Sequence, residues 1–182
     1  MVTQLTSNST AGKFRADGLC FGVITSRYNN SITESLERAA LEALKTGGAN
    51  EKQLDVLSVP GAFELPLAAK KLAESGKVNA IVAIGCVLRG ETSHYDYICS
   101  EVARGIQLAQ MDTGVPVIFC VLTCDTMEQA VERAGPGAGN KGHEAGLAAL
   151  EMANLVRKLS GAAPRDAKSD AKKLPGKRKA RR

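Results

Sequence analysis

Apolar residues in this chain gather in four short runs, which are separated by longer segments of mixed polarity. The runs cover residues 20–25, 54–59, 80–88 and 116–122 and are rich in residues that favour strands. The third run is almost entirely apolar, as expected of a strand that is buried on both faces of a sheet. The pattern predicts four core strands.

The segments between the runs have helical spacing. Ile32, Leu36 and Ala40 recur at intervals of four residues after the first run. Ser31 and Glu34 stand three residues apart just before them, which is the spacing of a capping box. We therefore predict a helix that begins near Ser31.

The same reasoning predicts four more helices. Pro66 stands where the first turn of a helix tolerates proline, and Thr126 with Gln129 is typical of a helix start. These predicted helices cover residues 66–75, 95–111, 126–135 and 140–159. Strands that alternate with helices indicate βαβ units with right-handed crossovers and a parallel sheet. The predicted fold class is α/β: a three-layer α/β/α sandwich around a doubly wound parallel sheet of four core strands.

Composition and charge divide the chain into three parts. Residues 14–160 form the predicted domain, residues 1–13 a flexible N-terminal segment, and residues 161–182 a tail without periodicity that we expect to be disordered. From Arg165 to Arg182 there are nine Lys/Arg and two Asp, a net charge of +7 within a total of +5. The rest of the chain therefore carries −2, which argues against a nucleic-acid-binding domain.

The cysteines and the absence of long apolar stretches bear on the compartment. The five cysteines are odd in number and form no CxxC pair, which favours a reducing compartment over a disulfide framework. No apolar run reaches the length of about 18 residues that a membrane span needs, and residues 1–13 do not resemble a signal peptide. We expect a cytoplasmic protein.

Unusual polar clusters follow all four predicted strands. They cover residues 26–29, 60–64, 89–95 and 123–126, whereas the opposite ends of the strands adjoin plain turns. Ligands of open parallel sheets bind beyond the carboxyl ends of the strands. The asymmetry therefore predicts a binding site at that edge.

Aromatic residues make up only 4% of the chain, and there is no Trp. Tyr28 and Phe63 nevertheless stand in two of the polar clusters, where they are suited to flank a flat heterocycle. The alternative is that each ring packs against the sheet. Glu64 is a candidate ligand for polar substrate groups, although a carboxylate in the first turn of a helix is also favoured by the helix dipole.

The third cluster has features of a phosphate site. Gly90, Glu91, Thr92 and Ser93 place hydroxyls and backbone N–H groups just before a helix N-terminus, which favours an anion. Ordinary capping by Ser or Thr is the alternative explanation. His94 follows directly and can exchange protons near neutral pH.

Two further cations flank a glycine-rich segment, residues 135–142. Arg133 and Lys141 suit a phosphate, and the alternative is a flexible turn with two solvated cations. His143 lacks such neighbours and is assigned to the surface or to packing. The chain contains neither GxGxxG nor GxxxxGK[ST], and no set of residues has metal-ligand spacing, so dinucleotide, P-loop and metal sites are not predicted.

Five segments, in order, resemble the lumazine synthase family from about residue 21 to 159. They are Ser26-Arg-Tyr-Asn29, VPGAFELP (59–66), GCVLRGETSHYDYI (85–98), GVPVIFCVLT (114–123) and ERAG…AGNKG (132–142). The resemblance implies a flavodoxin-like subunit in a ring of five, with each site shared by two neighbours. The first subunit would supply Tyr28, Asn29, Ala62, Phe63, Glu64, Val87, Leu88, Glu91, Thr92 and His94, and its neighbour Phe119, Arg133 and Lys141.

The resemblance also implies roles for these residues. Tyr28, where many relatives have Phe or Trp, would stack on a pyrimidine, Glu64 would bind ribityl hydroxyls, and backbone at Val87–Leu88 would bind the heterocycle. His94 would shuttle protons, while Glu91, Thr92 and Arg133 would hold a phosphate, with Lys141 near the phosphate and ribityl groups.

The implied reaction condenses 5-amino-6-(D-ribitylamino)uracil with 3,4-dihydroxy-2-butanone 4-phosphate in riboflavin biosynthesis, with no cofactor and no metal. A non-catalytic flavin-binding protein and a shell-forming protein are the alternatives on the same fold. The glycine-rich segment resembles relatives that build icosahedral shells of twelve pentamers, so pentamer and shell both stay open. Nucleic-acid binding by the basic tail is a further alternative, for which a solvated tail is the simpler interpretation.

Overall fold

The computed structural model describes residues 15–137 and 139–161. The predicted flexible segment, residues 1–13, and the predicted tail beyond Gly161 lie outside the described residues. No helix in the described ranges is long and apolar enough to cross a membrane.

Four parallel strands form one sheet with the order β2-β1-β3-β4. They are β1 (Phe21–Ser26), β2 (Leu54–Val59), β3 (Ala80–Leu88) and β4 (Val117–Cys124). The predicted α/β class and the four core strands are confirmed. β4 ends two residues later than predicted, because its ladder with β3 continues through the pair Leu88 and Cys124.

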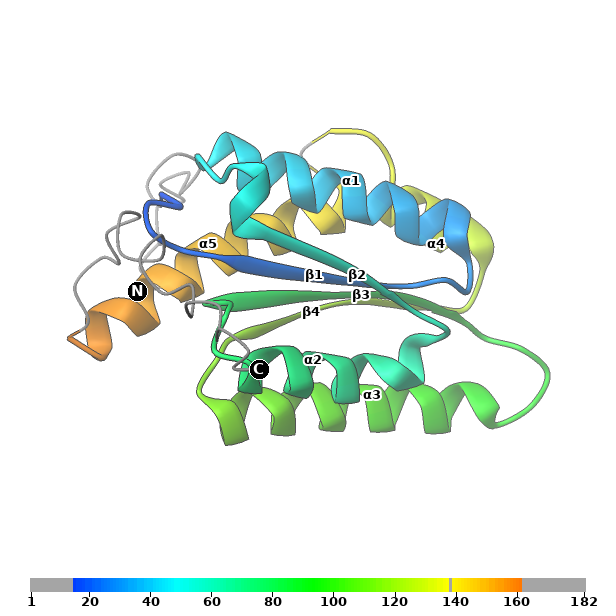
Figure 1. Ribbon diagram of the computed structural model, residues 1–182. Coiled ribbons are helices and arrows are strands. Elements are labelled where there is room, and N and C mark those ends of the chain that lie inside the picture. Colours follow the sequence, from blue (N-terminus) through cyan, green and yellow to red (C-terminus); the bar gives the residue numbers. More distant parts are fainter. Residues whose placement is uncertain (1–14, 138, 162–182) are drawn as a thin grey trace, which may run out of the picture.

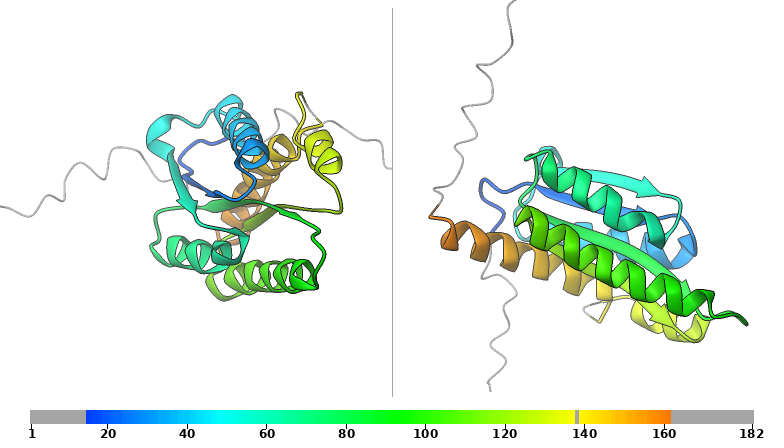
Figure 2. Two further views of the ribbon diagram at one scale, coloured as in Figure 1. Left: turned by 90° about the vertical axis from the view of Figure 1, so that its right-hand side faces the viewer. Right: turned by 90° about the horizontal axis from the view of Figure 1, so that it is seen from below.

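Helices cover both faces of the sheet (Figures 1 and 2). One layer contains α1 (Asn30–Thr46), α4 (Met127–Arg133) and α5 (Lys141–Leu159), and the other contains α2 (Leu65–Glu74) and α3 (His94–Thr113). Two short 3₁₀ turns that the sequence did not predict, η1 (Glu51–Gln53) and η2 (Ala62–Glu64), flank β2. The three-layer sandwich is therefore confirmed.

Alternate residues of β3 divide the hydrophobic core into two halves. Val82 and Ile84 pack with the α1 and α5 side, whereas Ile81 and Ala83 pack with the α2 and α3 side, and all four are fully buried. A strand with both faces buried must be apolar at every position. This explains why residues 80–88 form the longest apolar run in the chain.

The predicted capping box at the start of α1 is wrong. The helix begins at Asn30, one residue before Ser31, and its N-cap is Asn29, whose side chain makes no capping hydrogen bond. Ser31 and Glu34 therefore lie inside the helix. The two later starts are confirmed: Thr126 accepts a hydrogen bond from the Gln129 backbone N–H, and α5 begins directly after Asn140.

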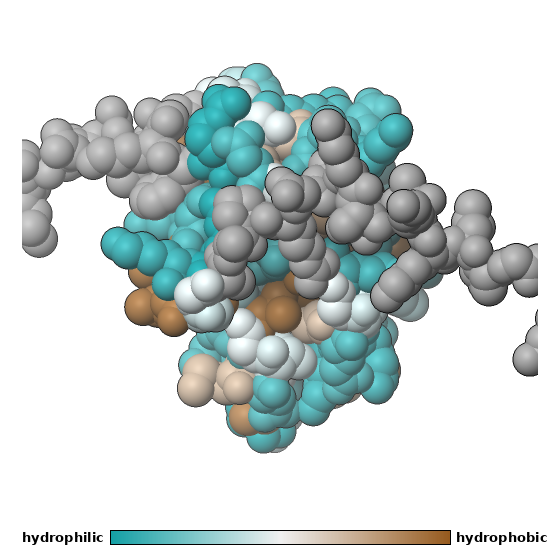
Figure 3. All heavy atoms as spheres, turned by 60° about the vertical axis from the view of Figure 1, so that its left-hand side comes forward, coloured by the Kyte–Doolittle hydropathy of each residue, from teal (hydrophilic) through white to brown (hydrophobic). Residues whose placement is uncertain are grey.

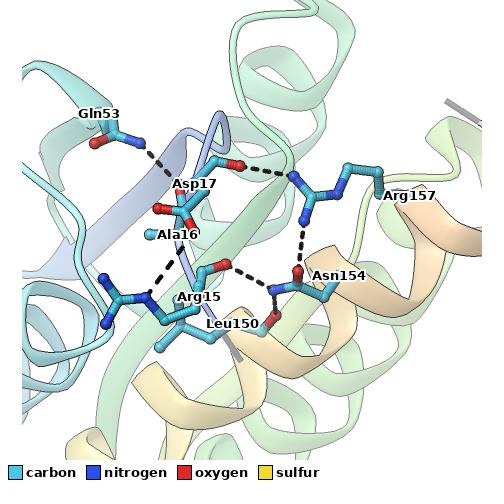
Figure 4. Close-up of polar contacts among 7 residues, drawn as sticks. All are labelled: Arg15, Ala16, Asp17, Gln53, Leu150, Asn154 and Arg157. Atoms are coloured by element: carbon cyan, nitrogen blue, oxygen red, sulfur yellow. Dashed lines mark hydrogen bonds and ion pairs between the residues drawn. The ribbon is translucent and has the colours of Figure 1, made fainter. Parts of the chain in front are cut away.

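Residues 15–17 are held against α5 before the chain enters β1 (Figure 4). Asn154 Nδ2 donates to the Arg15 carbonyl at 2.9 Å, and Arg157 Nη1 donates to the Asp17 carbonyl at 2.7 Å. Gln53 Nε2 donates to the Ala16 carbonyl from the opposite side. The described domain thus begins with an anchored segment at the amino edge of the sheet.

Figure 3 brings the amino edge of the sheet forward. Among the residues that it colours, hydrophilic ones predominate, and apolar ones form separate small groups.

Gly142 allows α5 to approach α1 closely. A Cβ at Gly142 would overlap the Leu36 carbonyl group and lie 2.7 Å from Leu36 Cα, so that backbone would have to move. We predict that Gly142→Ala lowers the free energy of unfolding by about 3 kcal/mol or more, at the upper end of overpacking costs. Urea denaturation measures this, with Gly139→Ala as the control because that position has open space. Equal midpoints for the two variants would contradict the packing argument.

Candidate active site

A cleft of about 730 Å³ opens at the carboxyl edge of the sheet. Its lining comes from the segments that follow β1, β2 and β3. β1 and β3 are neighbours, yet the chain leaves β1 for α1 on one face and β3 for α3 on the other. A cleft at such a topological switch point is the usual ligand site of a doubly wound sheet.

Tyr28 presents an aromatic face at the mouth of the cleft. Its side chain is 71% exposed, so it does not pack into the core. The ring lies against Gly61, where a Cβ would come within 2.9 Å of the Tyr28 ring. Gly61 thus leaves room for the ring, which is free to stack on a flat ligand.

Asn29 ties the segment after β1 to the end of β3. It has φ 57° and ψ 47° and is the one described non-glycine residue with positive φ. Its Nδ2 donates to the Cys86 carbonyl at 2.9 Å. This bond holds in place the backbone just before Val87 and Leu88, which form part of the cleft wall.

Glu64 has a local structural role that leaves part of its carboxylate available. Its Oε2 accepts a hydrogen bond from the Gly61 N–H at 2.8 Å, which stabilises the turn before α2. The other oxygen has no hydrogen-bond partner in the described part of the chain, and Glu64 lines the cleft. Phe63, next to it, is 56% exposed and lines the same cleft.

The wall and floor of the cleft are apolar. Ala62, Cys86, Val87, Leu88 and Ile98 line it. Burial raises the pKa of the Cys86 thiol to about 11, and the nearby Cys124 thiol adds to this effect. Cys86 is therefore a neutral wall residue near neutral pH.

The start of α3 points an incompletely capped helix N-terminus at the cleft. His94 is the first residue of α3 and lines the cleft together with Gly90, Thr92 and Tyr95. Ser93 occupies the N-cap position, but its side chain makes no capping hydrogen bond. The ordinary capping explanation therefore does not apply to Ser93, whereas Thr92 Oγ1 accepts a hydrogen bond from the His94 backbone N–H at 3.4 Å. A helix N-terminus of this kind favours an anion.

A second hollow of about 470 Å³ contains three more of the predicted residues. Phe119, Arg133 and Lys141 line it from β4, α4 and α5. Lys141 Nζ is paired with Glu144 at 2.7 Å, whereas Arg133 donates to the Gln129 carbonyl and forms no ion pair within the described residues. Phe119 is 44% exposed.

The structure thus sorts the predicted site residues into two groups. The cleft is lined by Tyr28, Asn29, Ala62, Phe63, Glu64, Val87, Leu88, Thr92 and His94, and the second hollow by Phe119, Arg133 and Lys141. Glu91 is exposed on the loop and lines neither.

The sequence did not predict Cys86 and Ile98 as lining residues, since both belong to segments whose pattern predicts a buried core. His143 lies apart, in a hollow shared with Arg38 and Glu42.

No three His, Cys, Asp or Glu side chains come close enough to hold a metal ion in the ranges that the structure describes.

The fold and the cleft define an α/β protein with a candidate small-molecule site at the switch point of a flavodoxin-like sheet. A family model described as 6,7-dimethyl-8-ribityllumazine synthase matches residues 18–157. The chain belongs to this family, which consists of transferases of riboflavin biosynthesis that act on small-molecule substrates as oligomers.

Two variants of Asn29 separate the contribution of its hydrogen bond from that of its left-handed backbone conformation. Asn29→Gly keeps the backbone conformation but loses the hydrogen bond to Cys86, and we expect it to cost about 0.5–1.5 kcal/mol of unfolding free energy. Asn29→Ala loses the same bond and adds roughly 1–2 kcal/mol for the left-handed backbone. Urea unfolding should therefore rank the wild type above the Gly variant and the Gly variant above the Ala variant. An Ala variant as stable as the Gly variant would contradict this ranking.

Two buried thiols make the free energy of unfolding decrease at alkaline pH. Burial raises the pKa of Cys86 to about 11 and that of Cys120 to about 12, from an ordinary value near 9. The unfolded chain thus loses these protons first, so their contribution is complete below pH 9 and declines as the pH rises towards 11. We predict a falling unfolding free energy above pH 9, with a shallower fall in Cys86→Ala. Parallel curves for the two proteins would rule out the contribution of Cys86.

Proposed function

We propose that the chain condenses 5-amino-6-(D-ribitylamino)uracil with 3,4-dihydroxy-2-butanone 4-phosphate to give 6,7-dimethyl-8-ribityllumazine, phosphate and water. The observation that carries this proposal is the combination of an exposed aromatic ring, an apolar wall and an incompletely capped helix N-terminus bearing His94 in one cleft. Such a cleft accommodates a flat heterocycle at one end and an anion at the other.

The cleft suits the two substrates in different places. The pyrimidine stacks on Tyr28 and hydrogen-bonds to backbone at Val87–Leu88, and the Glu64 carboxylate binds ribityl hydroxyls. The sugar phosphate binds at Thr92 and the first turn of α3. The support for these roles is that all these groups line the same cleft.

The cleft as described contains no cation for the phosphate. Neither Lys nor Arg is among its described lining residues, whereas Arg133 and Lys141 line the second hollow. We propose that the second hollow of one subunit faces the cleft of the next in a ring of five. The exposed rings of Phe63 and Phe119 support this arrangement, because burial between subunits would remove both from water.

The chemistry requires proximity and proton transfer. The amine of the uracil adds to the ketone and forms a Schiff base with loss of water, phosphate leaves, and ring closure loses a second water. Holding two reactants in place supplies about 7–11 kcal/mol at best. His94, at the mouth of the cleft, moves protons between the reacting groups, an effect worth typically about 10²–10⁴-fold.

Mixed assembly of two impaired variants tests whether neighbouring subunits share the site. His94→Ala slows the reaction by about 10²–10⁴-fold, and Arg133→Ala raises the KM for the sugar phosphate because it removes a charged hydrogen bond worth roughly 1.5–3 kcal/mol. When the two variants are unfolded and refolded together in equal amounts, about a quarter of the interfaces combine both intact halves. At a low concentration of the sugar phosphate we therefore expect about a quarter of the wild-type activity.

The control is the same pair of variants refolded separately and then combined. It should show only the average of the two residual activities. A co-refolded sample that also shows only this average would place Arg133 outside the site of the neighbour. A native mass of five chains, or of a multiple of five, would accompany a positive result.

A further inference from the structure

Arg89, the first residue of the loop between β3 and α3, has no role in the function proposed so far. Its Nε donates to Asp125 Oδ1 at 2.7 Å, and its Nη1 donates to Asp96 Oδ1 at 3.1 Å. Its guanidinium carbon lies 4.0 Å from the centre of the Tyr95 ring. One side chain thus contacts three residues at the carboxyl edge.

The ends of two strands bring these groups together. The Arg89 backbone N–H donates to the Cys124 carbonyl at 2.9 Å, which continues the β3–β4 ladder by one step. Asp125 follows Cys124 directly, and Asp96 lies in the first turn of α3. The planar fork of Arg can satisfy two carboxylates and stack on a ring at the same time, which an ammonium group cannot do.

These contacts make Arg89 unsuitable as a phosphate ligand, although it stands beside the predicted phosphate loop. Two carboxylates already pair with its charge. The hydrogen bond that Arg89 donates to Asp125 is the largest cause of the raised pKa of its guanidinium. Its charge is therefore already balanced by two carboxylates of the protein and is not free to pair with a phosphate.

The residues that Arg89 contacts lie in α3, which begins with His94, or shortly before α4, which ends at Arg133. Tyr95 lines the cleft next to His94, and Asp96 lies in the same helical turn as both. On the other side, the Asp125 backbone N–H donates a hydrogen bond to Gln129 Oε1 at 3.0 Å. Gln129 belongs to α4, the helix that ends at Arg133.

We infer that Arg89 is a positioning residue, which fixes the His94-bearing first turn of α3 against the turn between β4 and α4 without contacting substrate. The inference rests on the proposed function only for its kinetic consequence. Misplacement of a catalytic group by about 1 Å can cost on the order of 10²-fold in rate. The loop between β3 and α3 projects from the sheet edge (Figure 1).

The kinetic test compares Arg89→Ala with Arg104→Ala. Arg104 is an exposed residue of α3 that also pairs with a carboxylate, that of Glu101, at 2.7 Å. We expect Arg89→Ala to lower kcat by about ten- to a hundredfold, while Arg104→Ala keeps the wild-type rate. Arg89→Lys should recover only part of the loss. A kcat for Arg89→Ala equal to that of Arg104→Ala would overturn the inference.

A direct phosphate contact would give a different pattern. It would raise the KM for the sugar phosphate and weaken inhibition by inorganic phosphate at an unchanged kcat, and this result would also overturn the positioning role. If Arg89 acts through Asp125, the double variant Arg89→Ala/Asp125→Asn should be no slower than Arg89→Ala alone. Multiplied losses would show that the two residues act independently and would count against the inference.

Hydrogen exchange tests the inference apart from catalysis. The hydrogen-bonded backbone amides of residues 89, 96 and 125 should exchange faster in Arg89→Ala than in the wild type or in Arg104→Ala, with similar urea midpoints for both variants. Unchanged exchange at these three amides would overturn the inference even if the enzyme is active. If the wild type fails to condense the two substrates, the proposed function falls, and the exchange result still decides the role of Arg89.

Discussion

The parallel pairing of β1 with β3 at the centre of the sheet is the constraint on which the site depends. The two strands are far apart in sequence, yet their ladder places the Ser26–Asn29 segment beside Cys86–Leu88. The chain turns to opposite faces after these strands, so neither loop covers the space between them. The Asn29–Cys86 hydrogen bond holds the two segments together at this point.

The division of charge follows from the same architecture. The cleft collects aromatic, apolar and hydrogen-bonding groups from the loops after β1, β2 and β3, while the cations Arg133 and Lys141 follow β4 and lie at a second hollow. A phosphate substrate needs both kinds of group. An oligomer of this family satisfies that need when one subunit completes the site of another, and the ring of five proposed above does so.

Several elements could be predicted because their signals are local. The bounds of β2 and β3 agree with the prediction at every residue, since each run is rich in strand-forming residues and bordered by turn residues. Pro66 and Thr126 mark helix starts through properties of their own backbone or side chain. The start of α1 could not be predicted in this way, because the Asn29 side chain bonds to a strand 57 residues away rather than to its own helix.

By itself, the sequence determined the α/β class, the strands, most helix starts and the edge at which the polar clusters lie, because periodicity and turn chemistry act over a few residues. Only the tertiary structure decided that the Asn29 side chain bonds to the Cys86 carbonyl and that Arg89 links the first turn of α3 to Asp125 after β4. It also separated the cleft from the cation-bearing hollow. These outcomes depend on strand order and on helix packing, which bring distant residues within hydrogen-bond distance and which no local pattern encodes.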